Sequence, residues 1–316
     1  MARPHIEPFV DRTVPFRKMT LPGFGKGMQY KTLSLDTDTG ACSLICQFEA
    51  GYELPPGMSY TELEMFLLNG SLTIGDEVHA PGTYVCLPAG VHLPAIKMPR
   101  GATALMYYNY GEPSFVESDA DHPLAQRSDL AIVNAYEQLQ WTSAAIYPAT
   151  APGCLVKILK YDQRTQGFTF LYCMTPNFWQ DNISYHDCCE ESYHIWGTSW
   201  MMQFGELPTG GYFWRPPYIN HGAFACKLGT LALGRTDTQL YNHFHFNPWT
   251  TPEENKERVA ARIQAWKPEL YSWINMKGHN HPVDFDYPHG HEHGDVPHHH
   301  GDGAVAHTHK RKRRRR

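Results

Sequence analysis

Short apolar runs separated by turn residues recur along most of the chain. Each run is rich in β-branched and aromatic residues and is bounded by Gly, Pro or Asp, which is typical of a β-strand between turns. The clearest runs are CSLICQF (42–48), LTIGDEV (72–78), TYVCLPA (83–89), TALMYYNY (103–110), FTFLYCM (168–174), SYHIWGTSWMMQF (192–204), GGYFWRP (210–216) and GTLALGR (229–235). Such short, regularly spaced strands predict an all-β fold, an antiparallel sandwich or jelly roll.

Two segments depart from this pattern and predict helices. One is a short helix around LAIVNAYEQLQW (130–141), and the other is TPEENKERVAARIQAW (251–266). In the second segment Thr251 and Glu254 have the spacing of a capping box, and Pro252 suits the first turn of a helix. We expect this C-terminal helix to pack on the β domains or on a second subunit.

The apolar pattern repeats itself at an offset of 128 positions. At this offset Gly82 aligns with Gly210, Tyr84 with Tyr212, Pro88 with Pro216, Gly101 with Gly229 and, upstream, Glu62 with Glu190. Several glycines, prolines and aromatic residues at one offset indicate a duplicated domain. The sequence therefore predicts two similar β domains in succession.

A dense group of ionisable residues lies in the second copy, within SYHDCCEESYHIWG (184–197). The offset pairs three of these side chains with residues of the first copy: His186 with Met58, His194 with Phe66 and Glu190 with Glu62. It also pairs His221, further along the second copy, with Leu93. Three imidazoles thus align with apolar side chains, which indicates that these positions face a domain interior in both copies. The second copy therefore differs from the first by carrying ionisable side chains at interior positions.

Charge is distributed unevenly along the chain. The last seven residues, KRKRRRR, carry +7, and five acids lie in 278–309, so the net charge of −5 leaves −7 on residues 1–277. An acidic body argues against a folded surface for nucleic acid. Specific nucleic-acid binding is therefore not expected.

The compartment is predicted from cysteines and from apolar run lengths. No run approaches the roughly 20 apolar residues of a membrane-spanning helix. The N-terminus lacks the apolar core of an export signal, since Pro4 and Glu7 interrupt it. The eight cysteines do not have the spacing of a small disulfide-bonded domain. A reduced, cytoplasmic protein is expected.

The C-terminal tail has a composition of its own. Ten of the nineteen histidines fall within 279–309, among Gly, Pro and Asp and without apolar periodicity. Such a composition predicts disorder. The histidines would bind Ni(II), Cu(II) or Zn(II) loosely, and the basic end would bind polyanions without specificity.

Two spacings in the second copy carry a resemblance to a known family: His186-x3-Glu190-x6-Gly197, and Gly210-x5-Pro216 followed by His221. With them, the chain resembles the cupin superfamily, and specifically a bicupin. The superfamily's motifs are G-x5-H-x-H-x3/4-E-x6-G and G-x5-P-x-G-x2-H-x3-N. The end of the first matches His186-x3-Glu190-x6-Gly197, and the second matches Gly210-x5-Pro216 followed by His221. Two departures stand in these motifs, Ser184 in place of the earlier His and Tyr218 in place of a Gly.

The resemblance implies a ligand set of His186, Glu190 and His221. Two imidazoles and one carboxylate are the composition of a facial triad, which leaves metal positions open. His194 shares strand parity with Glu190, so it is either a fourth ligand or a donor that holds Glu190 in place. Arg215 precedes the Pro216 turn and is expected to hold a substrate oxygen or to form a structural ion pair.

The resemblance also implies a reaction class. Fe(II) is the expected metal, with Mn(II), Ni(II) or Zn(II) as other options for such ligands. The arrangement looks most similar to cupin dioxygenases, and the aromatic surroundings favour a small ketone, enol or aromatic substrate. Two alternatives stay open: a Lewis-acid isomerase, lyase or decarboxylase, and a non-enzymatic metal-handling or ligand-sensing bicupin. Bicupins commonly associate, so a homo-oligomer is expected.

Other ligands remain possible at this point. A bulge would exchange Glu191 for Glu190, and Cys188 lies on the same face as Glu190 and would suit a softer metal. His92 with Glu62 would make a weak site in the first copy. His243 and His245 alternate in NHFH and would face one side of a strand.

The expected organisation follows from these features. It comprises an N-terminal arm (1–30), a metal-free cupin domain (31–113), a linker (114–150), a metal-binding cupin domain (151–250), a helical segment (251–277) and a disordered His-rich and basic tail (278–316).

Overall fold

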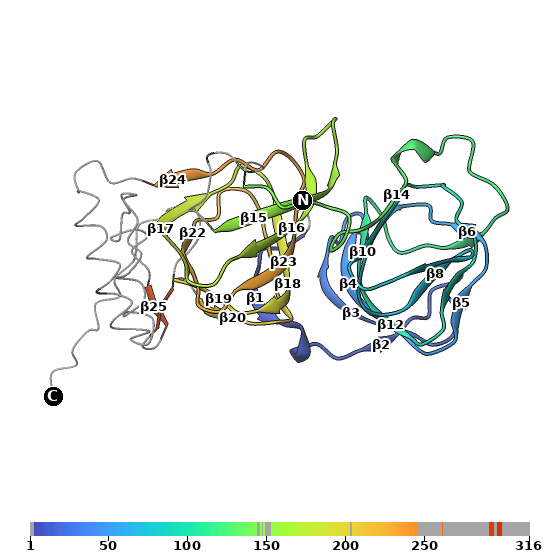
Figure 1. The fold of residues 1–316 in the computed structure, drawn as a ribbon, viewed down its shortest axis with the longest axis horizontal. Coiled ribbons are helices and arrows are strands. Elements are labelled where there is room, and N and C mark those ends of the chain that lie inside the picture. Colours follow the sequence, from blue (N-terminus) through green and yellow to red (C-terminus); the bar gives the residue numbers. More distant parts are fainter. Residues whose placement is uncertain are drawn as a thin grey trace. The chain divides into compact units, whose positions relative to one another are not determined.

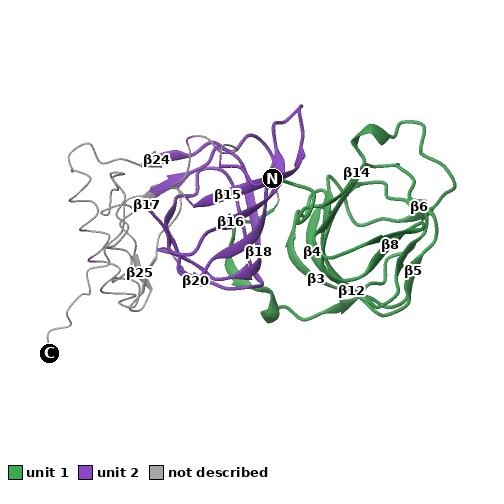
Figure 2. Cartoon of the chain, in the orientation of Figure 1, with its two compact units in different colours: residues 1–140 green, residues 141–316 purple. Residues whose placement is uncertain are grey.

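The computed structural model describes residues 3–143, 146, 148, 153–202, 204–245, 261, 291–293 and 296–298. The chain forms two compact units, residues 1–140 and 141–316, which have different colours in Figure 2. Apart from residue 261, the helix expected at 251–266 lies outside the described residues, as does most of the expected tail. Among the described residues, no helix has the length and apolar character needed to span a membrane.

The first unit is almost entirely β. Its elements are β1 (Ile6–Val10), η1 (Asp11–Thr13), β2 (Arg17–Lys18), β3 (Met28–Leu35), β4 (Cys42–Phe48), β5 (Tyr52–Leu54), β6 (Gly57–Met58), β7 (Glu62–Gly70), β8 (Leu72–Ile74), β9 (Glu77–His79), β10 (Thr83–Leu87), β11 (Ile96–Met98), β12 (Ala102–Asn109), β13 (Val116–Glu117), η2 (Arg127–Asp129) and β14 (Ala131–Asn134). One sheet has the order β14-β10-β7-β12-β4-β3-β2 and a second has the order β5-β11-β8-β9. Apolar side chains of both sheets share one core cluster.

The second unit repeats this architecture (Figure 1). Its strands are β15 (Cys154–Tyr161), β16 (Phe168–Met174), β17 (Phe178–Tyr185), β18 (Glu190–Gly197), β19 (Ser199–Met201), β20 (Gly205–Leu207), β21 (Gly211–Arg215), β22 (His221–Cys226), β23 (Thr230–Thr236), β24 (His243–His245), β25 (His291–His293) and β26 (Val296–His298). The order β21-β18-β23-β16-β15 matches β10-β7-β12-β4-β3, and β17-β22-β19-β20 matches β5-β11-β8-β9. The expected all-β fold with a duplicated jelly roll is confirmed.

The short helix expected around 130–141 is wrong. Residues 131–134 form β14, which pairs antiparallel with β10, and Ile132 lies opposite Val85. The β-branched side chains Ile132 and Val133 favour this extended backbone, because their χ1 freedom is restricted in a helix. The apolar spacing that indicated a helix comes instead from a strand followed by a turn.

The offset of 128 also needs a correction within one pair of strands. Leu63 pairs with Leu87, and at the same place in the second unit Glu190 pairs with Arg215. The counterpart of Glu190 is therefore Leu63, not Glu62, and β7 corresponds to β18 at an offset of 127. Successive side chains of a strand point to opposite faces of the sheet. A shift of one residue in the alignment therefore assigns each side chain of β7 to the other face.

Candidate metal centre

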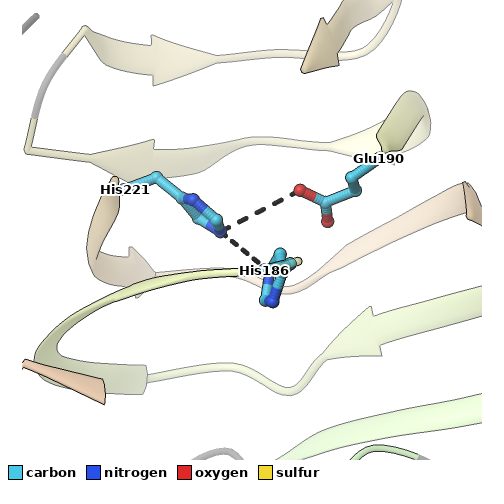
Figure 3. Close-up of side chains that lie close together, drawn as sticks. All are labelled: His186, Glu190 and His221. Atoms are coloured by element: carbon cyan, nitrogen blue, oxygen red, sulfur yellow. Dashed lines mark hydrogen bonds and ion pairs between the residues drawn. The ribbon is translucent and has the colours of Figure 1, made fainter. Parts of the chain in front are cut away.

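Three side chains meet at one end of the second jelly roll, as Figure 3 shows. Glu190 is the first residue of β18 and His221 is the first residue of β22, while His186 directly follows β17. Pairing of Ser184 with His221 brings β17 and β22 together at this end. The segment after β17 is held to the segment before β22 by a hydrogen bond, in which the backbone N–H of Tyr218 donates to the carbonyl oxygen of His186 at 2.8 Å.

The potential ligand atoms of these residues lie within 4.8 Å of one another. The Nε2 atoms of His186 and His221 are 3.1 Å apart, and His221 Nε2 is 3.9 Å from Glu190 Oε2. Both imidazoles are buried, and the Glu190 side chain is 16% exposed. Among the described residues, no other group of three His, Cys, Asp or Glu side chains is placed this closely.

Backbone carbonyls orient both imidazoles. His186 Nδ1 lies 3.1 Å from the carbonyl oxygen of Tyr241, and His221 Nδ1 lies 2.8 Å from that of Ile219. A carbonyl oxygen only accepts, so each Nδ1 carries the proton and donates it. Burial lowers the pKa of His186, and burial together with the Arg215 charge holds the pKa of His221 well below its usual value. Both rings are therefore neutral at pH 7.

Neutral rings with protonated Nδ1 atoms present bare Nε2 lone pairs to each other. Two lone pairs 3.1 Å apart repel unless a cation lies between them. Glu190 Oε2 is also buried and accepts no hydrogen bond within the described part of the chain. Two nitrogens bound about 2.1 Å from one metal at a right angle would lie about 3.0 Å apart. The observed separation fits a divalent cation with His186, Glu190 and His221 as ligands.

Arg215 is the cation beside this cluster. Its Nη1 lies 3.5 Å from Glu190 Oε2, Nη2 donates to the sulfur of Met201 at 3.3 Å, and the guanidinium stacks 4.0 Å from the Phe213 ring. Arg215 is 4% exposed. This expected site residue thus lies beside the candidate metal centre, next to the carboxylate of Glu190.

A cavity of about 80 Å³ adjoins the three candidate ligands. Its walls are largely apolar, and the acidic and basic side chains among the residues that line it are Glu190 and Arg215, with the imidazoles neutral. Gln180 and Asn242 add amide groups to the wall. The cavity therefore admits a small molecule and gives it one cationic contact.

His194 lines the same cavity but does not join the cluster of ligand atoms. Its Nδ1 donates to the carbonyl oxygen of Leu207 at 2.9 Å, and burial lowers its pKa to about 4. The parity argument placed this residue on the interior face, where it lies. His194 lies next to the three candidate ligands, and its Nδ1 donates to the carbonyl of Leu207 and not to Glu190.

The reserve ligands lie elsewhere. Glu191 is buried in a network of its own, where it accepts a hydrogen bond from Tyr212 Oη at 2.6 Å and pairs with Arg235. Cys188 packs in an apolar cluster, and burial raises the pKa of its thiol, which disfavours the thiolate that binds metals.

The remaining histidine candidates form no cluster of three in the described residues. Glu62 accepts a hydrogen bond from Asn109 at 2.8 Å, and the backbone N–H of His92 donates to Asp121. His243 stacks on Tyr185 with ring centroids 4.7 Å apart and lies 3.4 Å from Asp187. The side chain of His245 lies outside the described part of the structure.

The comparisons with known proteins agree with this architecture. The family described as "Domain of unknown function (DUF4437)" matches residues 22–243, which include both jelly rolls and all three candidate ligands. The chain belongs to the DUF4437 family. No curated protein matches it in sequence.

Solved structures share the fold of this DUF4437 protein at low sequence identity. A putative dioxygenase from Nostoc punctiforme is 21% identical, with a TM-score of 0.69 over 75% of this chain and 88% of that one. A deletion mutant of Bacillus subtilis oxalate decarboxylase is 13% identical, with a TM-score of 0.50 over 86% of this chain and 87% of that one. The fold is that of a bicupin, as the sequence motifs predicted.

Sequence reasoning missed the groups that orient the ligands in this DUF4437 protein. The carbonyl oxygens of Tyr241 and Ile219 fix the protonated nitrogen of each imidazole, yet any residue supplies a carbonyl, so no sequence signal marks them. Gln180 was missed too, although its place in the strand before His186 was a usable signal.

Proposed function

We propose that the second unit is a mononuclear metal-dependent dioxygenase with Fe(II) bound by His186, Glu190 and His221. The observation that carries this proposal is the donor set itself: two bare Nε2 atoms 3.1 Å apart beside a buried carboxylate oxygen. Two imidazoles and one carboxylate that leave positions open are typical of Fe(II) oxygenases. The name of the Nostoc punctiforme structure agrees with this assignment.

The charges at the site select the substrate. A divalent ion together with Glu190 and Arg215 leaves a net charge of +2 next to an apolar cavity. Low-dielectric surroundings make an unbalanced charge costly, so the site favours an anion. The volume of about 80 Å³ limits its size. A small enolisable ketone that binds as its enolate, such as a 2-oxo acid or a β-diketone, meets both conditions.

Each residue then has a defined task. Bound Fe(II) would supply Lewis acidity and reactivity toward dioxygen. His186 and His221, held by their carbonyl contacts, would keep the two nitrogens aimed at the ion. Arg215 would orient a substrate oxygen through its planar donors, and Phe213, which lies under the guanidinium, would exclude water from it.

The ligand set is tested by spectroscopy on the full chain. Apoprotein receives one equivalent of Fe(II) and then nitric oxide, and the spin-3/2 signal of an iron–nitrosyl complex is followed. His186→Ala and His221→Ala should each lose about 90% or more of this signal, because removing a ligand weakens binding more than the tenfold to hundredfold typical of an outer partner. His92→Ala removes a histidine of the first unit and should retain the signal. All proteins keep the histidine-rich tail, so a variant that lacks both His186 and His221 gives the background from loose binding, and this background is subtracted from each signal. A signal that survives in His221→Ala would overturn the ligand assignment.

Oxygen uptake tests the reaction. A panel of 2-oxo acids and β-diketones is supplied to the Fe(II)-loaded protein, and we expect one dioxygen consumed per substrate. Turnover that persists under strict anaerobiosis would assign the site to the Lewis-acid alternative instead. No turnover in either atmosphere, with the nitrosyl signal intact, would leave a metal-binding bicupin without enzymatic activity on this panel.

A further inference from the structure

The first unit also encloses a cavity, in the place that corresponds to the metal centre. Its volume is about 40 Å³, and its walls come from both sheets of the unit. Representative lining residues are Met65, Val85, Leu87, Leu93 and Met98. No charged side chain is among the residues that line it. This interior offers no metal ligands, and it is not filled by protein.

One polar group in this apolar cavity has no partner. Tyr108 lies on β12, where Ala104, Met106 and Tyr108 alternate into the core cluster. The residue is 0% exposed, and its hydroxyl forms no hydrogen bond with any described residue. Buried hydroxyls nearly always have a partner, so each exception calls for an explanation.

The neighbouring polar groups are already engaged. Ser59 Oγ lies 3.3 Å from Ser114 Oγ, which also accepts from the Tyr60 backbone N–H, and Tyr52 Oη is directed at the sulfur of Met28 at 3.8 Å. A buried water normally makes two to four hydrogen bonds, and here a single hydroxyl is left for it. A ligand that accepts one hydrogen bond and is otherwise apolar suits the site better than water.

The chemistry of the ligand follows from the lining. Burial raises the pKa of Tyr108 well above its usual value, so the hydroxyl stays protonated and acts as a donor. Without a charged lining residue to balance it, an ion would be poorly solvated. We propose that the interior of the first unit is a second binding site, for a small uncharged molecule with one hydrogen-bond-accepting oxygen, which receives the hydrogen bond of Tyr108.

Methionine methyl groups can report which unit binds such a molecule. Met65, Met98 and Met106 line the first cavity, whereas Met174 and Met201 line the second. The full chain, labelled with ¹³C at the methionine methyls, is titrated with 2-butanone and separately with xenon. Single Met→Leu variants assign the signals. We expect 2-butanone to shift the first-unit methyl signals saturably.

Tyr108→Phe is the decisive variant, since it removes the hydroxyl and keeps the ring. It should weaken 2-butanone binding about fivefold, the contribution of one ordinary hydrogen bond, while the response to xenon stays unchanged. The variant should also raise the melting temperature of ligand-free protein, because the buried hydroxyl has no partner to lose. Val85→Leu adds bulk to the cavity wall and keeps the Tyr108 hydroxyl, so it should weaken the binding of both probes.

Three results would overturn the proposal. The first is a saturable shift confined to Met174 and Met201, which would place the ketone in the metal-binding unit only. The second is no saturable shift at either set of methyls. The third is equal 2-butanone affinity in wild type and Tyr108→Phe. None of these outcomes depends on iron binding, so the proposed dioxygenase and this site can fail separately.

Discussion

The two units keep the same frame but differ in what lines their interiors. In the second unit the Tyr218 N–H donates to the His186 carbonyl at 2.8 Å, and in the first unit the Gly90 N–H donates to the Ser59 carbonyl at 2.7 Å. The loop that carries His186 and the corresponding loop of the first unit are thus held by the same backbone hydrogen bond. The counterpart of His186 is therefore Ser59, not the Met58 that the offset of 128 indicated.

A second shared feature lies outside the candidate site. Tyr212 Oη donates to Glu191 and Tyr84 Oη donates to Glu64, both at 2.6 Å. These buried pairs occur in both units, which indicates that they belong to the common frame. A buried carboxylate by itself therefore says little about function in this protein.

At the candidate site the units differ in four positions. The second unit has His186, Glu190, Arg215 and His221 where the first unit has Ser59, Leu63, Leu87 and Leu93. The first-unit set contains no ionisable side chain, which shows that the jelly roll folds without the ionisable set of the second unit. Burying ionisable groups costs free energy unless they are paired, so the polar set is best explained by a ligand. The following predictions transfer first-unit features into the second unit.

Arg215→Leu carries the largest expected effect, because it installs the residue found at Leu87. It removes the cation 3.5 Å from Glu190 and the group proposed to hold the substrate. Truncating one partner of a buried charge pair costs about 2–5 kcal/mol, so kcat/KM should fall about a hundredfold. The Fe(II) stoichiometry should stay at one, because the three ligands remain. Steady-state oxygen uptake and iron analysis measure both quantities.

Arg235→Leu is the matched control for this variant. Arg235 also pairs with a buried glutamate of β18, Glu191, but it does not line the cavity. Its loss should lower the free energy of unfolding while kcat/KM per folded molecule stays close to wild type. Equal losses of kcat/KM in the two variants would show that Arg215 acts through stability alone.

Acid should destabilise the second unit through His194, whose counterpart in the first unit is Leu67. Burial lowers the pKa of His194 to about 4, whereas an unfolded histidine titrates near 6.5. The unfolded state therefore binds the extra proton below pH 6.5. The stabilising contribution is full above that pH and is lost as the pH falls toward 4, by about 3 kcal/mol in total.

Tryptophan fluorescence can measure this loss in the second unit alone. All eight tryptophans lie at position 141 or later, so their emission does not report on the first unit. In EDTA-treated protein, urea unfolding of His194→Leu should depend less on pH between 6.5 and 4 than that of wild type, by the same 3 kcal/mol or so. An unchanged pH dependence in the variant would mean that other groups cause the acid sensitivity.

The sequence alone predicted many of the strands and the three candidate ligands, because both depend on the order of residues within short segments. Apolar runs located the strands, with CSLICQF coinciding with β4 and FTFLYCM with β16. The motif spacing named His186, Glu190 and His221, which the structure brings together. The spacing identified neighbouring residues because Glu190 and His221 begin strands and His186 directly follows one.

The register between the units could not be read from the sequence. Gly70 to Gly82 and Gly197 to Gly210 differ by one residue, an insertion in the hairpin that follows β7 and β18. At the offset of 128, Glu62 aligned with Glu190 without a gap, and this match hid the one-residue insertion. Only the backbone pairing shows Leu63 as the true counterpart, since turn insertions leave no mark on the apolar pattern. The carbonyls that orient the imidazoles were equally invisible.

Tyr218 is the departure from the cupin motif whose effect should be smallest. Its φ is +69°, in the left-handed region, and its counterpart Gly90 has a φ of +75°. A Cβ in this region clashes with its own backbone, a strain of about 1–2 kcal/mol that glycine avoids. Tyr218→Gly should therefore be more stable than Tyr218→Ala by about 1 kcal/mol.

Comparing Ala with Gly isolates the backbone strain, because both variants lose the contact between the Tyr218 and Tyr185 rings. Urea unfolding followed by tryptophan fluorescence measures the difference. Gly90→Ala is the reciprocal change in the first unit, where the new Cβ would also lie 2.8 Å from His122 Cβ, so it should destabilise that unit. If Tyr218→Ala were as stable as Tyr218→Gly, the turn would have to relax out of the left-handed conformation. The hydrogen bond from the N–H of residue 218 to the His186 carbonyl would then not hold the His186 loop in the way that the Gly90 hydrogen bond holds the Ser59 loop.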